Sequence, residues 1–311
     1  MSVTDPIERF DPDTMGGRLL EAEHVARYRW ATALVAGKRV LDAGCGTGYG
    51  SDLLAEAAAE VVGIDVDAEA FADRERRHGN VTLSVGDLRA LPEELGRFDA
   101  VVCFEVVEHL DDPDPALDGL VRVLGPGGIL VVSSPNRDVY PPGNPYHKHE
   151  FRPDELAGAL GARLANVRLV RQVDWLATGV FDDDELASSE ALPVPVAKTA
   201  PGEPGKELYS IALASDGPLP DTQPFVMVAD TADLRWWQEV VQGLRDELAA
   251  KATHVQQLEG WLQQRTSELE DKNAEAQELN DTIAAMQATR AWRLGTSYWG
   301  LRDRLLRRRL G

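Results

Sequence analysis

A glycine-rich segment and a carboxylate further along the chain have the residue types and spacing to bind a nucleoside. The segment VLDAGCGTGYG places Gly44, Gly46 and Gly48 directly after an apolar run. Glycine permits tight turns and close approach of the backbone to a ligand. Asp65 ends the next apolar run, where a carboxylate can accept hydrogen bonds from both ribose hydroxyls of an adenosine. We therefore expect a nucleoside-containing ligand at this loop.

The spacing argues against a dinucleotide such as NAD. The dinucleotide fingerprint requires a third glycine at position 49, and Tyr49 stands there. Asp87 ends a third apolar run, where it could meet an adenine amino group while Leu88 packs on the ring. Asp87 could instead cap the turn that follows it.

The elements that must position these residues follow an α/β pattern. Apolar runs rich in β-branched residues alternate with helical stretches between Arg39 and Ser134, which predicts βαβ units and a parallel sheet. The predicted strands are 39–44, 60–65, 81–87, 98–105 and 128–136, and the predicted helices are 51–59, 68–77 and 115–124. Two later apolar runs, 167–173 and 209–214, are expected to close the sheet as an antiparallel pair.

These features resemble the class I S-adenosylmethionine-dependent methyltransferases over residues 25 to 215. The resemblance rests on LDAGCGTG, Asp65, the Gly86–Asp87 pair, FDAVVCFEVVEHL and LGPGGILVVSSPN. It implies a Rossmann-like, doubly wound sheet of seven mostly parallel strands in a domain of residues 39–216. It also implies S-adenosylmethionine as the cofactor.

The resemblance implies a role for particular residues. Those expected near the methionine portion of the cofactor are Gly44, Cys45, Gly46, Gly48 and Glu105. Asp42 would orient the loop and the amino group, Asp65 would hold the ribose with Val66 beside it, and Asp87 and Leu88 would flank the adenine. Residues 1–38 would form lid helices, in which Arg27 and Tyr28 are candidates to close over the cofactor.

The segment after the fifth strand is expected to face the methyl acceptor, because ligands of open α/β sheets bind beyond the carboxyl ends of the strands. It contains His147, His149 and Glu150. One interpretation makes His147 the base that removes the acceptor proton, with His149 as a second candidate. The other makes these residues hydrogen-bonding anchors of the loop. No metal is expected, because two histidines at this spacing lack a clear third ligand. His109 is interpreted as structural.

The methyl acceptor is less well determined by the sequence. The NPYHKHEF loop and the C-terminal segments are similar to bacterial methyltransferases associated with surface-polysaccharide synthesis, which favours O-methylation of a glycan or of a nucleotide-linked or lipid-linked sugar. A quinone or other aromatic hydroxyl is the alternative acceptor. A net charge of −20 argues against a nucleic-acid partner. A third hypothesis is a catalytically weak scaffold that recruits glycan-synthesis partners.

The C-terminal third has a different pattern. After a linker at 217–232, apolar residues repeat every seven positions over 233–290, which predicts a coiled coil with a second copy or a partner protein. A helix folded back on its own domain is the alternative. Residues 291–311 form a basic amphipathic tail: from Arg290 onward there are seven arginines and one aspartate. Such a tail suits an anionic membrane surface, or it could bind an acidic protein surface.

The sequence also bears on the compartment. The two cysteines, Cys45 and Cys103, exclude a secreted disulfide framework. The polar N-terminus and the lack of a long apolar run predict neither a signal peptide nor a membrane-spanning helix. We expect a cytoplasmic protein, with peripheral contact at the inner face of the plasma membrane through the tail.

Overall fold

The computed structural model of the chain describes residues 18–72, 77–175, 180–187, 196–199, 201–227 and 234–307. The chain divides into two units, Met1–Thr231 and Ala232–Gly311. Predictions that concern residues 1–17, parts of the linker and the last four residues lie outside the described residues.

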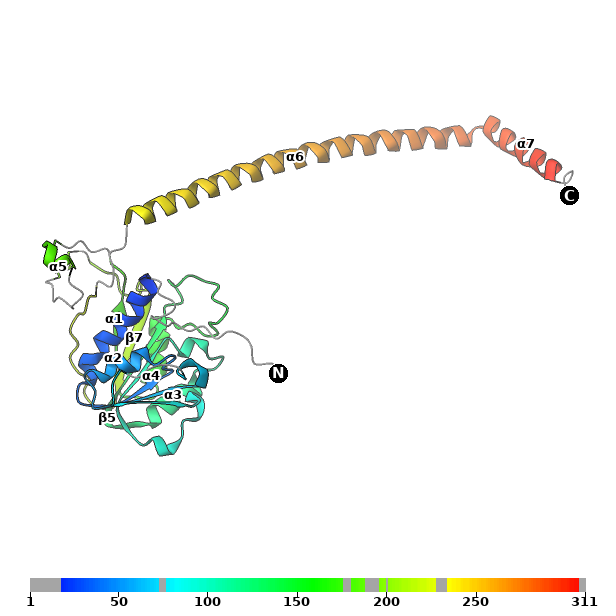
Figure 1. The fold of residues 1–311 in the computed structure, drawn as a ribbon. Helices are drawn as coiled ribbons and strands as arrows, with labels where there is room; N and C mark the ends of the chain where they lie inside the picture. Colours follow the sequence, from blue (N-terminus) through cyan, green and yellow to red (C-terminus); the bar gives the residue numbers. More distant parts are fainter. Residues whose placement is uncertain are drawn as a thin grey trace. The chain divides into compact units, whose positions relative to one another are not determined.

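The first unit is built on a seven-stranded sheet (Figure 1). The strand order is β3-β2-β1-β4-β5-β7-β6, and β7 alone runs antiparallel to its neighbours. The strands are β1 (Arg39–Ala43), β2 (Glu60–Asp65), β3 (Val81–Val85), β4 (Phe98–Phe104), β5 (Leu124–Pro135), β6 (Asn166–Gln172) and β7 (Tyr209–Ser215). This confirms the predicted α/β fold, including the antiparallel closing pair. The order reverses between β1 and β4, so the carboxyl ends of these strands form the crevice in which ligands of such sheets bind.

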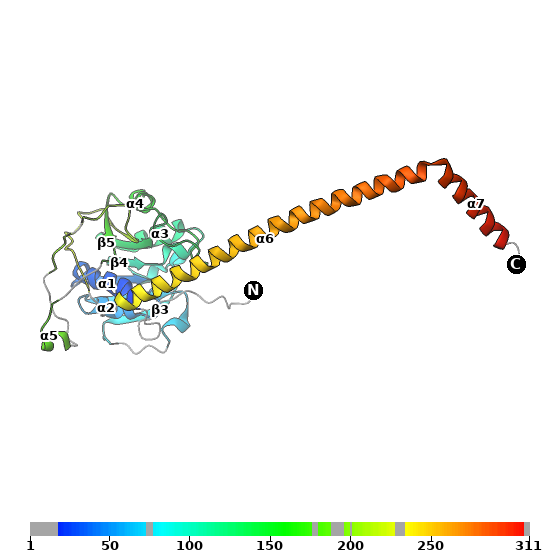
Figure 2. The same cartoon turned by 90° about the horizontal axis from the view of Figure 1, so that it is seen from above.

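Helices cover both faces of the sheet. The α-helices of this unit are α1 (Arg18–Val35), α2 (Tyr49–Ala55), α3 (Asp114–Arg122), α4 (Pro153–Gly161) and α5 (Asp183–Ala187). Figure 2 shows α1 and α2 on one side of the strands and α3 and α4 on the other. Successive strand residues point to opposite faces: Val40 packs in the cluster with α1 and α2, and Leu41 in the cluster with α3 and α4. The buried core therefore lies on both sides of the sheet.

Two elements differ from the prediction. The helix expected over 68–77 is a single 3-10 turn, η1 (Ala68–Ala70), in its described part, where Asp67 caps the turn by accepting a hydrogen bond from Glu69 N. β5 begins four residues before the expected start because Leu124 pairs with Phe98 ahead of a shift in register. Three further 3-10 turns, η2 (Leu88–Ala90), η3 (Glu93–Leu95) and η4 (Val107–His109), follow β3 and β4.

The second unit consists of α6 (Leu234–Ala288) and α7 (Arg290–Arg307). A long helix was predicted here, and the helix is confirmed; its association with another chain remains a prediction. In the predicted heptad register Leu234 is the first a position, and three d positions of the seam hold basic residues. Each has an acidic partner on the same helix: Lys251 with Glu247 at 2.7 Å, Arg265 with Glu268 at 2.6 Å and Lys272 with Glu275 at 2.7 Å. Among the described residues, no helix has the length and apolarity needed to cross a membrane.

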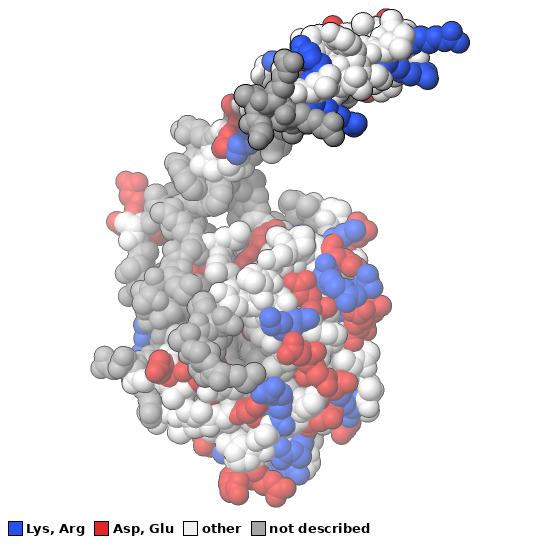
Figure 3. Space-filling model, turned by 90° about the vertical axis from the view of Figure 1, so that its right-hand side faces the viewer, with Lys and Arg blue, Asp and Glu red and all other residues white. Residues whose placement is uncertain are grey.

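Charged side chains of both signs occur on the face of the molecule that Figure 3 displays, where they are interspersed. Several of these charges form ion pairs at the surface, such as Arg89 with Asp87 and Arg137 with Glu155, both at 2.7 Å. Exposed pairs of this kind contribute little stability, because water screens them.

Candidate functional site

The glycine loop joins β1 to α2 and has an unusual backbone. Gly44, Gly46 and Gly48 all have positive φ angles, 79°, 54° and 82°, which glycine adopts without strain. A Cβ atom on Gly44 would lie 2.3 Å from Cγ2 of Val106, so a larger residue would collide with the loop after β4. The thiol of Cys45 is buried. The loop therefore presents mainly backbone at the carboxyl end of β1.

The Asp65 carboxylate is fixed to this loop. Its Oδ2 accepts a hydrogen bond from Gly46 N at 2.9 Å, and its Oδ1 accepts one from Asp67 N at 3.1 Å. The contact arises because β1 and β2 are parallel neighbours whose carboxyl ends meet. Val66, the next residue, is 56% exposed. The structure thus brings together the predicted glycine loop and the predicted ribose-binding acid.

Asp42 lies beneath the loop and is fully buried. Its Oδ1 accepts a hydrogen bond from the Tyr28 hydroxyl at 3.1 Å, and its Oδ2 accepts one from the Ser51 hydroxyl at 2.6 Å. Burial raises the pKa of Asp42 to about 6, and the two hydroxyl hydrogen bonds oppose this shift. Asp42 therefore ties α1 and α2 to β1, and its expected role in orienting the loop and the cofactor amino group stays a prediction. Tyr28 is also buried, and its ring lies against Gly50 of α2.

Arg27 extends from α1 into a buried network at the end of β4. Its Nη1 lies 2.9 Å from Oε1 of Glu105, its Nε donates to Gln172, and the Ser133 hydroxyl donates to the same Glu105 oxygen at 2.6 Å. Glu105 has a φ of 54°, a strained conformation for a residue other than glycine. Arg27 is 2% exposed, and its Nη2 is buried without a hydrogen-bond partner among the described residues. A guanidinium held in this way can bind a carboxylate.

Asp87 and Leu88 follow β3. Asp87 caps η2 by accepting a hydrogen bond from Arg89 N at 2.9 Å, and the hydrogen bonds from Arg89 hold the pKa of Asp87 below its usual range. Leu88 is buried in the core cluster that includes α3. The structure thus shows Asp87 as the cap of η2, which was the alternative interpretation. Contact of Asp87 or Leu88 with an adenine remains a prediction.

The loop after β5 holds His147 in defined contacts. The Nδ1 atom of His147 lies 2.6 Å from Oε1 of Glu150, and its Nε2 atom lies 3.0 Å from Nδ2 of Asn144. Because a carboxylate accepts and an amide nitrogen donates, these contacts place a proton on Nδ1 and a lone pair on Nε2. His149 does not join this group, since its ring packs on Phe151 with centroids 4.6 Å apart. The contacts agree with loop anchoring, and a role as a base stays a prediction.

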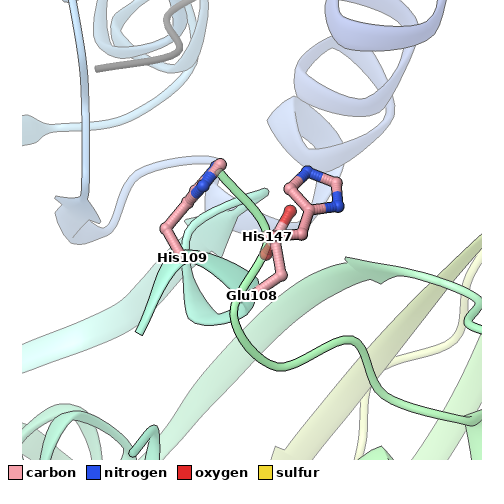
Figure 4. A group of neighbouring side chains, drawn as sticks. All are labelled: Glu108, His109 and His147. Atoms are coloured by element: carbon pink, nitrogen blue, oxygen red, sulfur yellow. The ribbon is translucent and has the colours of Figure 1, made fainter. Parts of the chain in front are cut away.

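Two further residues lie beside His147, and the sequence interpretation did not include them in the site. Glu108 and His109 come from η4, and ligand atoms of the three side chains lie within 4.8 Å of one another (Figure 4). Glu108 is fully buried, and neither carboxylate oxygen has a hydrogen-bond partner among the described residues. Burial raises the pKa of Glu108 well above its usual value, and the Glu105 charge raises it further. In the sequence, the motif EVVEHL has two acidic residues followed by a histidine, and this was the signal that could have identified Glu108 and His109.

Comparison with known proteins places these features in context. Residues 41–132 match the sequence family described as "Methyltransferase domain". A "Probable S-adenosylmethionine-dependent methyltransferase" of Mycolicibacterium smegmatis is 40% identical over 142 residues, which cover 44% of this chain and 55% of that protein. The "Ubiquinone biosynthesis O-methyltransferase" of Bordetella avium is 32% identical over 180 residues, which cover 50% of this chain and 71% of that protein.

Among solved structures, the N-methyltransferase NodS of Bradyrhizobium japonicum WM9 matches with a TM-score of 0.46 and 19% identity, over 66% of this chain and 100% of that one. The chain spans little more than half the length of the mycobacterial relative. The family description and both relatives' names concern methyl transfer. The mycobacterial name specifies S-adenosylmethionine as the donor, and the Bordetella name specifies transfer to oxygen.

Proposed function

Because the chain belongs to the S-adenosylmethionine-dependent methyltransferase family, we propose that it transfers the methyl group of this cofactor to a hydroxyl oxygen of a small acceptor molecule. The observation that carries the proposal is the 2.9 Å contact between Asp65 and Gly46, which fixes a carboxylate against a positive-φ glycine loop at the switch point of the sheet.

The residues around the loop fit S-adenosylmethionine. Asp65 would accept the ribose hydroxyls, and the backbone of Gly44 to Gly48 would lie against the methionine portion. The unpartnered Nη2 of Arg27 supports this assignment, because a buried guanidinium nitrogen fits a cofactor carboxylate better than an apolar group. The bound cofactor supplies an electrophilic methyl group on a sulfonium.

The protein's part in such a reaction is to align the acceptor and exclude water. Good alignment accounts for about 7–11 kcal/mol in the most favourable intramolecular reactions. The Arg27–Glu105–Ser133 network holds the end of β4 rigidly, and the loop containing His147 would provide the acceptor side. His147 would then contact the acceptor through the Nε2 lone pair after Asn144 moves aside.

A hydroxyl acceptor is favoured by the name of the Bordetella relative, an O-methyltransferase of ubiquinone biosynthesis. That name supports the quinone or aromatic-hydroxyl alternative rather than the glycan acceptor, for which the comparisons supply no support. The weak-scaffold hypothesis is less favoured, because the positive-φ glycines and Asp65 keep the geometry of a binding loop.

The test is a transfer assay with purified full-length protein and methyl-labelled S-adenosylmethionine. The acceptor panel would contain hydroquinones, catechols, nucleotide sugars and lipid-linked glycans. Transfer of the label to an aromatic hydroxyl, as a methyl ether, would support the proposal. Transfer to a sugar would show that the acceptor is a glycan and not an aromatic hydroxyl. Absence of transfer to every acceptor, together with absence of cofactor binding, would refute the proposed function.

A further inference from the structure

A partly buried cluster after β4 has the composition of a metal site. Glu108 and His109 lie on η4, and His147 lies in the loop after β5, so two segments far apart in sequence supply three ligand atoms within 4.8 Å (Figure 4). The loop is pinned there, because the Glu108 carbonyl oxygen accepts hydrogen bonds from Lys148 N at 2.7 Å and His149 N at 3.0 Å. The rings of His109 and His147 meet edge to face with centroids 5.2 Å apart.

The burial of the Glu108 carboxyl group has no compensating hydrogen bond among the described residues. Glu108 is 0% exposed, and neither of its carboxylate oxygens has a hydrogen-bond partner among the described residues. Burial of a polar group without a partner is costly, and buried carboxylates normally are paired or coordinate a metal. Arg27, whose charge opposes the pKa rise of Glu108, is already paired with Glu105 at 2.9 Å.

The hydrogen bonds of both histidines match those of metal ligands. A ligating histidine usually donates its other ring N–H to a carboxylate or a backbone carbonyl, which fixes the ring orientation. His147 Nδ1 lies 2.6 Å from a Glu150 oxygen, and His109 Nδ1 lies 3.2 Å from the carbonyl oxygen of Tyr146. In each ring the Nδ1 proton is thereby fixed and Nε2 carries the lone pair. A metal at His147 would displace the amide of Asn144, which lies 3.0 Å from Nε2.

From these observations we propose that Glu108, His109 and His147 bind one divalent transition-metal ion, of which Zn²⁺ is the best fit. Two imidazoles and one carboxylate form a ligand set that suits Zn²⁺ and Fe²⁺ and leaves at least one coordination position open. If the proposed function holds, that position accepts the acceptor hydroxyl and lowers its pKa, and this contact replaces direct contact of the acceptor with the Nε2 lone pair of His147. The sequence analysis expected no metal because His147 and His149 lack a clear third ligand, and it did not consider Glu108 and His109 together with His147.

The test is metal binding by chelator-treated full-length protein. Zn²⁺ is titrated calorimetrically, and Co²⁺ serves as a spectroscopic substitute whose visible absorption reports ligand number. The expected result is one ion per chain with micromolar or tighter affinity. Glu108→Gln, His109→Gln and His147→Gln should each weaken Zn²⁺ binding at least about tenfold, since even outer hydrogen-bond partners account for about 10- to 100-fold.

His149→Gln is the matched control. It removes an imidazole two residues from His147, on the same loop, and should leave Zn²⁺ affinity unchanged because His149 packs on Phe151 instead. Circular dichroism identifies any variant that fails to fold, and the two histidine variants keep the test decisive if Glu108→Gln does fail. No binding of Zn²⁺ or Co²⁺ by the wild type, or equal loss in His149→Gln, would overturn the proposal.

The metal result is separable from the proposed function. A parallel titration of the chelated protein with S-adenosylmethionine tests the cofactor site alone, because none of the three ligands belongs to the glycine loop. Zn²⁺ binding without cofactor binding would retain the metal site and refute methyl transfer. Cofactor binding without Zn²⁺ binding would refute the metal site and leave the proposed methyl transfer standing.

Discussion

Removal of the Asp65 carboxylate should weaken S-adenosylmethionine binding strongly. In the proposed complex Asp65 accepts two ribose hydroxyls, and hydrogen bonds to a charged group contribute about 1.5–3 kcal/mol each. At the lower limit the pair amounts to about 3 kcal/mol, or roughly 150-fold in the dissociation constant. Because water can replace part of this interaction in Asp65→Ala, we set the expected loss at tenfold or more, measured by isothermal titration calorimetry.

Two further variants separate the ribose contact from its structural side effects. Asp65 also accepts a hydrogen bond from Gly46 N at 2.9 Å. Asp65→Asn keeps one oxygen for that hydrogen bond, so it should bind S-adenosylmethionine more tightly than Asp65→Ala. Asp99→Ala is the control. It removes a carboxylate that accepts a hydrogen bond from Arg39 N at 3.0 Å, at the opposite end of β1 from the glycine loop, and it should leave cofactor affinity unchanged. Wild-type affinity in Asp65→Ala, or competition by NAD, would refute the assignment.

Three other predictions concern Asp42 and the second unit. Burial raises the pKa of Asp42 from 3.8 to about 6, so the folded chain binds this proton more tightly than the unfolded chain does. Ionisation of Asp42 therefore lowers the free energy of unfolding as the pH rises from about 4 to about 6. The stability of Asp42→Asn relative to wild type, measured by urea unfolding, should therefore rise by up to about 1.4 kcal/mol per pH unit between pH 4 and 6 and level off above. Leu248→Asp with Leu262→Asp should convert an oligomer to a monomer in light scattering, because both side chains are exposed on the predicted seam of α6. A chain that ends at Thr289 should fail to float with anionic liposomes at low salt, whereas the full chain should float and be released by high salt, because each arginine near an anionic surface contributes about 1 kcal/mol.

Each of these has an internal control. A pH-independent stability difference between Asp42→Asn and wild type would contradict the burial argument. Thr253→Asp with Ser267→Asp adds the same charge to α6 at the heptad position farthest from the seam and should leave the oligomer intact. A monomeric wild type would remove the homo-oligomer. Equal flotation of the full and shortened chains would assign the tail to a protein contact.

Local patterns in the sequence were sufficient to predict the sheet. Apolar runs rich in β-branched residues located every strand, because that signal lies within each segment. The Gly46–Asp65 contact was also predictable, since adjacent parallel strands bring their carboxyl ends together. The helix expected at 68–77 failed in its described part because Asp67 caps a 3-10 turn that ends at Ala70.

The acceptor side was less predictable for a physical reason. His147 belongs to an irregular loop, and its position beside Glu108 depends on hydrogen bonds from Lys148 and His149 to the Glu108 carbonyl, a contact across about forty residues that leaves no periodic signal. Similarly, the lack of a partner for the Glu108 carboxylate is a property of three-dimensional packing. The residue itself was visible in EVVEHL, but its burial was not.

The most direct test of the cofactor assignment is a crystal structure of the full chain with S-adenosylhomocysteine. We expect the nucleoside at the carboxyl end of β1 and β2, with both ribose hydroxyls in hydrogen-bonding distance of Asp65 and the amino-acid portion beside Gly44 to Gly48. Binding elsewhere on the sheet, or a ribose without contact to Asp65, would contradict this assignment.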